Sequence, residues 1–153
     1  MYNTTPITEF IVGLLKDCRL AVLATEGNGQ PHASLIAITP FRGFRQIIFA
    51  TYRNTRKYGN LKLNGRVAVL IQGEDGDSSG QNKVTVLTAF GHAAEVEISE
   101  LDETANVHRE RHPDLANLLQ SPDFAVFRVK VKTYQIVRGI EDIAWLDVED
   151  YMD

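Results

Sequence analysis

Two threonines and two basic residues lie where a short apolar run of the sequence gives way to a polar, helix-forming stretch. They are Thr51, Thr55, Arg56 and Lys57, within the segment FATYRNTRKYGNLKLNGRVAVLIQ. The pattern predicts a strand, a turn, an amphipathic helix and another strand, with the basic pair in the first helical turn. The first amides of a helix lack intrahelical partners and carry the positive end of its dipole, so the pair is suited to a phosphate. A solvated helix face is the alternative that the pair alone leaves open.

Two histidines, His108 and His112, stand four residues apart on a predicted helix, so both imidazoles could reach one metal ion. A zinc-protease helix has glutamate directly after its first histidine, where this chain has Arg109. Neighbouring arginines also disfavour a bound cation. We therefore interpret the pair as part of an exposed polar helix face and predict no metal site.

Other ligand-binding motifs are incomplete or absent. The acidic segment 75–80 (DGDSSG) begins like a calcium loop, but Val86 stands where the bidentate glutamate is required. The chain has neither the GxxxxGKS phosphate loop nor the GxGxxG dinucleotide fingerprint, and Ser34 lacks the glycines of a nucleophile elbow. These absences argue against a P-loop enzyme, a Rossmann domain and a serine hydrolase.

Length, charge and cysteine content restrict the class of protein. The 153 residues suit one domain, 1–153, with a substantial hydrophobic core, and the net charge of −4 provides no basic field for nucleic acid. The single cysteine, Cys18, excludes an intrachain disulfide and fits a reducing compartment, and we expect it to be a packed structural residue. The N-terminus lacks a basic start and a cleavage site, and no apolar run is long enough to span a bilayer. We therefore expect a cytoplasmic protein without membrane or nucleic-acid partners.

Periodicity and turn residues predict the elements that position the basic pair. They comprise a helix at 6–17, strands at 19–25, 32–39 and 46–51, a helix from 54 or 55 to 64, a strand at 66–72, a polar loop at 73–82, β structure at 83–98 with Gly91 as a bulge or bend, and helices from 99 and at 113–119. A strand at 124–131 follows, which residues 134–138 continue or double, and a last short strand lies at 143–146. Short turns join neighbouring strands, whereas each parallel crossover needs a dozen or more residues. We therefore predict a mainly β fold, with about six antiparallel strands in a closed or nearly closed barrel and peripheral helices.

Two motifs fall into a shared register once these strands are laid out. Gly29-Gln30-Pro31 precedes the second strand, and Phe49-Ala50-Thr51 is followed by Thr55-Arg56-Lys57, Asn60-Leu61, Asn64 and Arg66-Val67. In this spacing residues 19–98 resemble the pyridoxamine 5′-phosphate oxidase-related family of FMN-binding split barrels. The resemblance implies a six-stranded antiparallel split barrel that binds FMN and forms a two-fold homodimer with the cofactor at the interface.

The resemblance also implies roles for individual residues. The strand after the GQP turn would line the isoalloxazine with its backbone, the end of the next strand would approach the ring, and the helix start would hold the phosphate. The implied cofactor-binding residues are Ser34, Leu35, Ile36, Ala37, Ala50, Thr51, Thr55, Arg56 and Lys57. Arginine binds phosphate oxygens bidentately and lysine adds a second charge, which agrees with the chemistry expected at the helix start. No catalytic acid or base is identified.

Several positions depart from the family pattern. The family commonly has arginine in place of Ser34, tyrosine in place of Ala50 and glutamine near Val86. The C-terminal motif with which true pyridoxamine phosphate oxidases grip the substrate phosphate is absent from the ending RGIEDIAWLDVEDYMD. These differences remove polar contacts and argue against the reaction that gives the family its name. Within the ending, Trp145 could cover the flavin of a partner subunit or lie in the core.

The sequence is therefore interpreted as an FMN-binding flavoprotein, a small oxidoreductase with an unknown substrate and an electron donor such as NAD(P)H. A non-catalytic flavin-binding, carrier or stress-related module is an alternative, because the same residues would hold FMN. The same fold binding the deazaflavin F420 or haem is a further alternative. For F420, the acidic tail would need cations such as Arg42, Arg45 and Arg53, which are otherwise a solvated loop surface.

Overall fold

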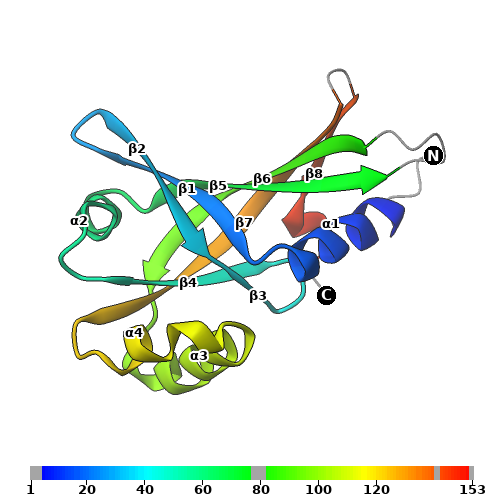
Figure 1. Cartoon of the computed structure of the whole chain (residues 1–153). Helices are drawn as coiled ribbons and strands as arrows, with labels where there is room; N and C mark the ends of the chain where they lie inside the picture. Colours follow the sequence, from blue (N-terminus) through cyan, green and yellow to red (C-terminus); the bar gives the residue numbers. More distant parts are fainter. Residues whose placement is uncertain (1–4, 77–81, 140–141, 152–153) are drawn as a thin grey trace.

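The computed structural model describes residues 5–76, 82–139 and 142–151, which form an antiparallel β-sheet with helices around it (Figure 1). In chain order the elements are α1 (Thr5–Asp17), β1 (Leu20–Gly27), β2 (Gln30–Ala37), β3 (Thr39–Phe41), β4 (Gln46–Tyr52), α2 (Arg56–Leu63), β5 (Arg66–Gly76), β6 (Asn82–Glu95), α3 (Ile98–Arg111), the 3₁₀ turn η1 (Pro113–Leu115), α4 (Ala116–Gln120), β7 (Phe124–Arg138), β8 (Asp142–Asp147) and the 3₁₀ turn η2 (Val148–Tyr151). The sheet order is β2-β1-β5-β6-β7-β4-β3, and β8 pairs with β7. This arrangement confirms the predicted mainly β split barrel.

The strand count of six was too low, since the described residues form an eight-stranded sheet. Residues 124–138 form one long strand, β7, so the segment 134–138 continues the strand predicted at 124–131. The short strand β3 pairs with β4 after the chain leaves β2, and β8 adds the pairing beyond β7. Of the loop predicted at 73–82, residues 73–76 extend β5 and Asn82 begins β6, while 77–81 lie outside the described residues.

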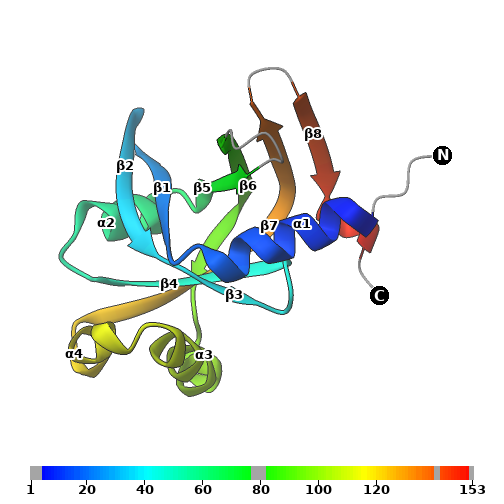
Figure 2. The same ribbon diagram turned by 45° about the vertical axis from the view of Figure 1, so that its right-hand side comes forward.

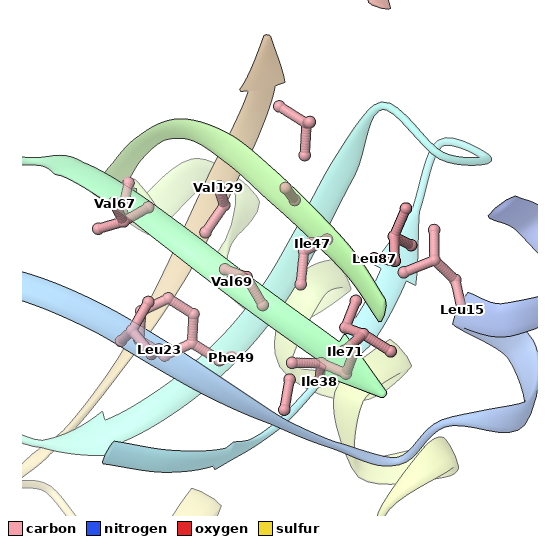
Figure 3. Close-up of a cluster of buried hydrophobic side chains, with 14 of the residues drawn as sticks. Leu15, Leu23, Ile38, Ile47, Phe49, Val67, Val69, Ile71, Leu87 and Val129 are labelled. Carbon is pink, nitrogen blue, oxygen red and sulfur yellow. The ribbon is translucent and has the colours of Figure 1, made fainter. Parts of the chain in front are cut away.

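The core lies inside the curved sheet and draws on residues from most strands. Figure 3 shows Leu23, Ile47, Phe49, Val69 and Val129 gathered between the strands, and all five are fully buried. Buried and exposed residues alternate along β1, which is the period of a strand with one face in the core, whereas β4 is buried on both faces at Ile47, Ile48 and Phe49. The phenyl rings of Phe49 on β4 and Phe127 on β7 stack with centroids 5.4 Å apart, so this pair links two neighbouring strands of the core.

A two-residue turn fixes the register of β1 and β2. Asn28 and Gly29 have φ angles of 53° and 82°, and Gly27 lies opposite Gln30. Positive φ at both central residues is typical of the tight hairpin turns whose twist matches that of the strands. This geometry confirms the predicted hairpin.

The predicted irregularity at Gly91 is a β-bulge. The pairing of β6 with β7 shifts between Phe90 and Gly91. A Cβ atom at Gly91 would lie 2.2 Å from the carbonyl oxygen of Lys130, so only glycine allows the two backbones to approach this closely.

The helices cover different parts of the sheet. Helix α2 packs against β1, α1 lies along the opposite end of the sheet, and α3 with α4 covers the region of β4 and β7 (Figures 1 and 2). A second buried cluster joins α3 and α4 to the sheet and consists of Ile48, Val96, Ala105, Leu119 and Val126. Among the described residues, no helix has the length and apolarity required to cross a membrane.

The interpretation of His108 and His112 as an exposed helix face is wrong. Their exposed fractions are 0% and 3%, because α3 turns this face toward the sheet. The His108 Nδ1 atom lies 2.7 Å from Thr39 Oγ1, and His112 Nε2 lies 2.6 Å from the carbonyl oxygen of Ile38. No group of three or more histidine, cysteine or carboxylate side chains in the described ranges could hold a metal ion.

Candidate functional site

The start of α2 is organised by hydroxyl groups. Thr55 is the N-cap, and its hydroxyl accepts a hydrogen bond from the Tyr58 amide at 3.3 Å. The same hydroxyl donates to the carbonyl oxygen of Tyr52 at 2.9 Å and lies 3.1 Å from the hydroxyl of buried Thr51. The hydroxyl proton of Thr55 is therefore engaged within the protein. The free amides of the first helical turn remain as donors at this position.

Arg56 and Lys57 follow the cap and have no ion pair or hydrogen-bonding side-chain partner among the described residues. The guanidinium of Arg56 is exposed, whereas Lys57 is half-buried, and this burial lowers the pKa of its ammonium group. A half-buried lysine without a counter-ion is costly, because desolvation disfavours its charge. The two cations are thus free to bind an anion at the helix start.

Strand β2 is an edge strand whose outer edge is unpaired. In an antiparallel pair, residues alternate between hydrogen-bonded and non-hydrogen-bonded positions. The two-residue turn makes Gly27 and Gln30 a hydrogen-bonded pair, and the bond from the Ile38 amide to the Arg19 carbonyl at 3.0 Å continues this alternation. The backbone groups that point away from β1 are consequently those at the intervening positions, Ala33, Leu35 and Ala37.

The side chains of β2 divide between the two faces of the sheet. Ile36 is buried inside, whereas Leu35 is 64% exposed on the outer face. The Ser34 hydroxyl and the His32 Nδ1 atom are buried and have no hydrogen-bond partner. Buried polar atoms are normally hydrogen-bonded, so these two atoms mark a place where a polar ligand group would be accommodated.

The predicted cofactor residues lie on three adjoining elements. Ser34 to Ala37 belong to β2, Ala50 and Thr51 end β4, and Thr55 to Lys57 begin α2. Strands β2 and β4 approach each other across the open side of the barrel (Figure 2). The three positions that depart from the family pattern, Ser34, Ala50 and Val86, are all half-buried here.

A charged network that sequence reasoning missed holds α2 in place. The Oε2 atom of Glu95 on β6 lies 3.0 Å from Arg53 Nη2. The Oε1 atom of Glu95 lies 3.1 Å from Lys62 Nζ and accepts a hydrogen bond from the Tyr58 hydroxyl at 3.2 Å. Partial burial raises the pKa of Glu95, but the hydrogen bonds from Lys62 and Arg53 outweigh it and lower that pKa overall. No short sequence motif predicts this network, because its members come from distant parts of the sequence.

The arginines considered for F420 do not form one groove. Arg42 and Arg45 lie at the start of β4, where their guanidinium groups stand over Phe41 and Phe44 at 5.3 and 5.8 Å. Arg53 lies beyond the other end of this seven-residue strand, about 26 Å from Arg45 at the usual rise per residue. It also donates to the carbonyl oxygens of Pro122 and Phe124.

The outer face of the sheet carries a row of cross-strand neighbours in which Leu35, Val22, Leu70 and Trp145 are exposed apolar side chains. Cross-strand pairing places Leu35, Val22, Leu70, Thr88, Gln135 and Trp145 in one line, here called the outer row. Trp145 is 58% exposed and stacks on Phe90, with ring centroids 6.0 Å apart. The alternative that placed Trp145 in the core is therefore wrong. Exposed apolar surfaces of this kind are typical of interaction sites.

Comparison with known proteins identifies the family. The family model described as pyridoxamine 5′-phosphate oxidase matches residues 7–138. The chain belongs to this family, which confirms the resemblance found in the sequence. No curated protein matches it in sequence.

Solved structures share the fold. The heme binding protein of Mycobacterium smegmatis has a TM-score of 0.82 and 20% identity, with 94% of this chain and 59% of that chain covered. ChuZ of Campylobacter jejuni has a TM-score of 0.78 and 13% identity, with 96% and 61% covered. The chain thus spans about three fifths of the length of these two proteins. General Stress Protein 26 of Bacillus anthracis str. Sterne has a TM-score of 0.69 and 22% identity, with 92% and 98% covered.

Proposed function

We propose that the protein is an FMN-binding flavoprotein that works as a homodimer and acts as a small oxidoreductase. The observation that carries this proposal is the pair of unpartnered cations, Arg56 and Lys57, at the capped start of α2 in a member of this family. Their position provides both formal charge and free backbone amides for a phosphate.

The phosphate would be held by two kinds of donor. Arg56 supplies a planar guanidinium that can bind two oxygens, and Lys57 supplies a compact charge. Thr55 would act indirectly, because its proton is already donated to the carbonyl oxygen of Tyr52 and its oxygen fixes the first helical turn. A phosphate beside Lys57 would also offset the desolvation that lowers the pKa of this lysine.

The ring would be positioned by the free edge of β2. The backbone groups of Leu35 and Ala37 provide donors and acceptors for the polar edge of a flavin, and the partnerless Ser34 hydroxyl provides one more. Buried Ile36 keeps the strand anchored in the core while its edge remains available. Bound FMN would supply hydride and electron transfer through its own ring system.

The proposed dimer uses the outer row. Leu35, Val22 and Leu70 are exposed apolar side chains on the neighbouring strands β2, β1 and β5, and Trp145 on β8 is exposed at the other end of the row. A second copy of this face would cover them. Self-complementary contacts around a two-fold axis are the usual basis of homodimers. Leu35 belongs both to this row and to the β2 edge, which is consistent with a cofactor bound close to the interface.

The decisive experiment compares FMN with riboflavin, which lacks the phosphate. The fluorescence of FMN should decrease when FMN binds to the protein. In the double variant Arg56→Ala with Lys57→Ala, the FMN dissociation constant should rise about 100-fold, as expected for two lost charge-assisted hydrogen bonds. Riboflavin affinity should change little.

Arg109→Ala provides the matched control, because it removes a half-buried arginine of α3 whose guanidinium donates a hydrogen bond to Asn106 Oδ1 and which is not a predicted cofactor-binding residue. FMN affinity should be unaffected in this variant. Wild-type protein that does not bind FMN would refute the proposal. An equal loss of FMN and riboflavin affinity in the double variant would place the phosphate elsewhere.

Catalysis is tested separately from binding. NADH and NADPH should each be mixed anaerobically with the FMN-loaded protein, and the loss of flavin absorbance near 450 nm should be followed. Reduction by either donor supports an oxidoreductase. Tight FMN binding without reduction by any donor would support the alternative of a flavin carrier or a stress-related module.

Haem is a second candidate ligand, favoured by the similarity of the fold to the heme binding protein of M. smegmatis. Absorption spectroscopy separates the two candidates. Titrated haemin should produce a sharp Soret band if haem is bound specifically. Competition between haemin and FMN would then show whether one ligand excludes the other.

A further inference from the structure

A hollow lies on the outer face of the sheet and is lined by none of the nine predicted cofactor residues. Its volume is about 520 Å³. Ala24, Ala68 and Phe90 stand opposite one another on β1, β5 and β6 and form an apolar floor. A hollow of this size with an apolar floor and a few polar groups is typical of small-molecule sites.

One side of this hollow is basic. Arg66, His92 and Lys130 are direct cross-strand neighbours on β5, β6 and β7, and Lys132 follows two residues after Lys130. Within the described parts of the chain, no carboxylate pairs with Arg66, Lys130 or Lys132. Gathering like charges across neighbouring strands is unfavourable unless an anion compensates them.

The carboxylate that lines the hollow already has hydrogen-bond partners. Glu26 also lines the hollow, but it accepts hydrogen bonds from the Asn64 side chain at 2.8 Å and from the Gly29 amide. These bonds lower the pKa of Glu26, with the Asn64 bond the larger cause. Glu26 therefore closes the hairpin, and among the described residues it forms no ion pair with Arg66, Lys130 or Lys132.

Two glycines shape the basic side. A Cβ atom at Gly65 would lie 2.6 Å from the His92 imidazole, and one at Gly91 would lie 2.2 Å from the Lys130 carbonyl oxygen. The bulge at Gly91 leaves Lys132 outside the regular pairing, on the same exposed side as Lys130. Bulges commonly redirect side chains beside binding sites.

We infer that this hollow binds a flat organic anion, an aromatic ring system that carries a carboxylate or a phosphate. The ring would lie on Ala68 and Phe90, and the anionic group would lie among Arg66, Lys130 and Lys132. Charge-assisted hydrogen bonds to these three cations supply the polar recognition, and the apolar floor supplies the ring contact. The residues that line the hollow include none of the nine predicted cofactor-binding residues.

The only tryptophan of the chain provides the readout. Trp145 stacks on Phe90, which lines the hollow, so a ring bound there will alter its fluorescence. The probe is 4-nitrobenzoate, a flat anion whose nitroaromatic ring quenches indole. Its neutral analogue, 4-nitrobenzamide, has the same ring without the charge. We expect saturable quenching by 4-nitrobenzoate and at least about tenfold weaker binding of 4-nitrobenzamide.

Substitutions of Arg66 and Lys130 test whether these cations bind 4-nitrobenzoate. Arg66→Ala with Lys130→Ala should weaken 4-nitrobenzoate binding at least about tenfold while FMN binding stays unchanged. Arg66→Gln with Lys130→Gln, which keeps longer side chains over the sheet, should show the same loss and guards against misfolding of the alanine variant. The double variant Arg56→Ala with Lys57→Ala is the matched control and should bind 4-nitrobenzoate normally.

Three results would overturn the inference. These are quenching that does not saturate, equal affinity for the charged and neutral probes, and unchanged affinity in folded variants of Arg66 and Lys130. Each result is independent of FMN binding, so failure of this site and failure of the flavin proposal can be distinguished.

Discussion

The hydroxyl groups of Thr51 and Thr55 lie 3.1 Å apart and join the last buried residue of β4 to the N-cap of α2. The chain therefore passes from the core to the start of α2 within four residues, and the two hydroxyl groups remain in contact. The Thr55 hydroxyl also bridges the Tyr52 carbonyl and the Tyr58 amide. The position of the two cations after Thr55 thus depends on this cap.

Removing the cap should weaken both the fold and FMN binding. Thr55→Ala should lower the free energy of unfolding by about 1 kcal/mol, which is typical for loss of an N-cap hydroxyl. FMN affinity should also fall, because the first helical turn would fray. Urea unfolding and FMN titration measure the two effects. Thr55→Ser keeps the hydroxyl and should retain both properties, whereas a fully stable Thr55→Ala protein would contradict this role.

A charge on the outer row should disrupt the proposed dimer. Leu35→Glu places a carboxylate on the exposed face of β2, and two copies would meet across the two-fold axis. Sedimentation velocity should show a shift from dimer to monomer. Leu63→Glu is the control, since Leu63 is 71% exposed on α2 and lies outside the outer row. Equal effects of both substitutions, or of neither, would exclude the outer row as the interface.

The start of α2 and the β1–β2 hairpin were predictable because their signals are local. Thr55 precedes a basic, helix-forming stretch, and Asn28 with Gly29 fits a tight turn. Gly91 was predictable as an irregularity because glycine is unusual inside a strand. Such features depend on residues a few positions apart.

Other features depend on contacts between distant segments and were not predictable. The burial of His108 and His112 requires knowing that α3 packs against the sheet and that Thr39 and Ile38 meet it there. The sequence of α3 does not indicate this packing, because the buried face of the helix includes a threonine and a histidine instead of a regular series of apolar residues. The outer-face position of Trp145 likewise follows from the pairing of β8 with β7, which the short apolar segment does not specify.

Arg111 should make a large contribution to stability. Its guanidinium donates to the carbonyl oxygens of Leu15, Lys16 and Cys18 at 2.8, 2.8 and 3.0 Å, and to that of Ile38 at 3.1 Å. It thereby joins the end of α1 to α3 and to the residue that follows β2.

Arg111→Ala should lower the free energy of unfolding by about 3 kcal/mol, because several charge-assisted bonds are lost together. Arg109→Ala, two residues earlier on α3, should change it by less than about 0.5 kcal/mol. Chemical denaturation of both variants measures the difference. Similar free energies of unfolding for the two variants would show that water can satisfy these carbonyl oxygens when the guanidinium is absent.

The buried imidazole of His108 should make stability depend on pH. Burial is the main cause that lowers its pKa from 6.5 to about 4, and the charges of His112 and Arg111 add to the effect. In the unfolded chain the pKa returns to about 6.5. Between these values the unfolded state binds a proton that the folded state does not, so stability rises with pH. This contribution is fully favourable above pH 6.5 and is lost as the pH falls toward 4.

The full loss corresponds to about 3 kcal/mol, since each pKa unit is worth about 1.4 kcal/mol. Urea unfolding at several pH values between 7 and 4.5 should show the decline. His108→Gln retains a partner for the Thr39 hydroxyl but cannot titrate, so the stability difference between wild type and this variant should shrink as the pH falls. Carboxylates titrate in both proteins and cancel in that difference. A difference that is independent of pH would show that His108 keeps an ordinary pKa in the folded protein.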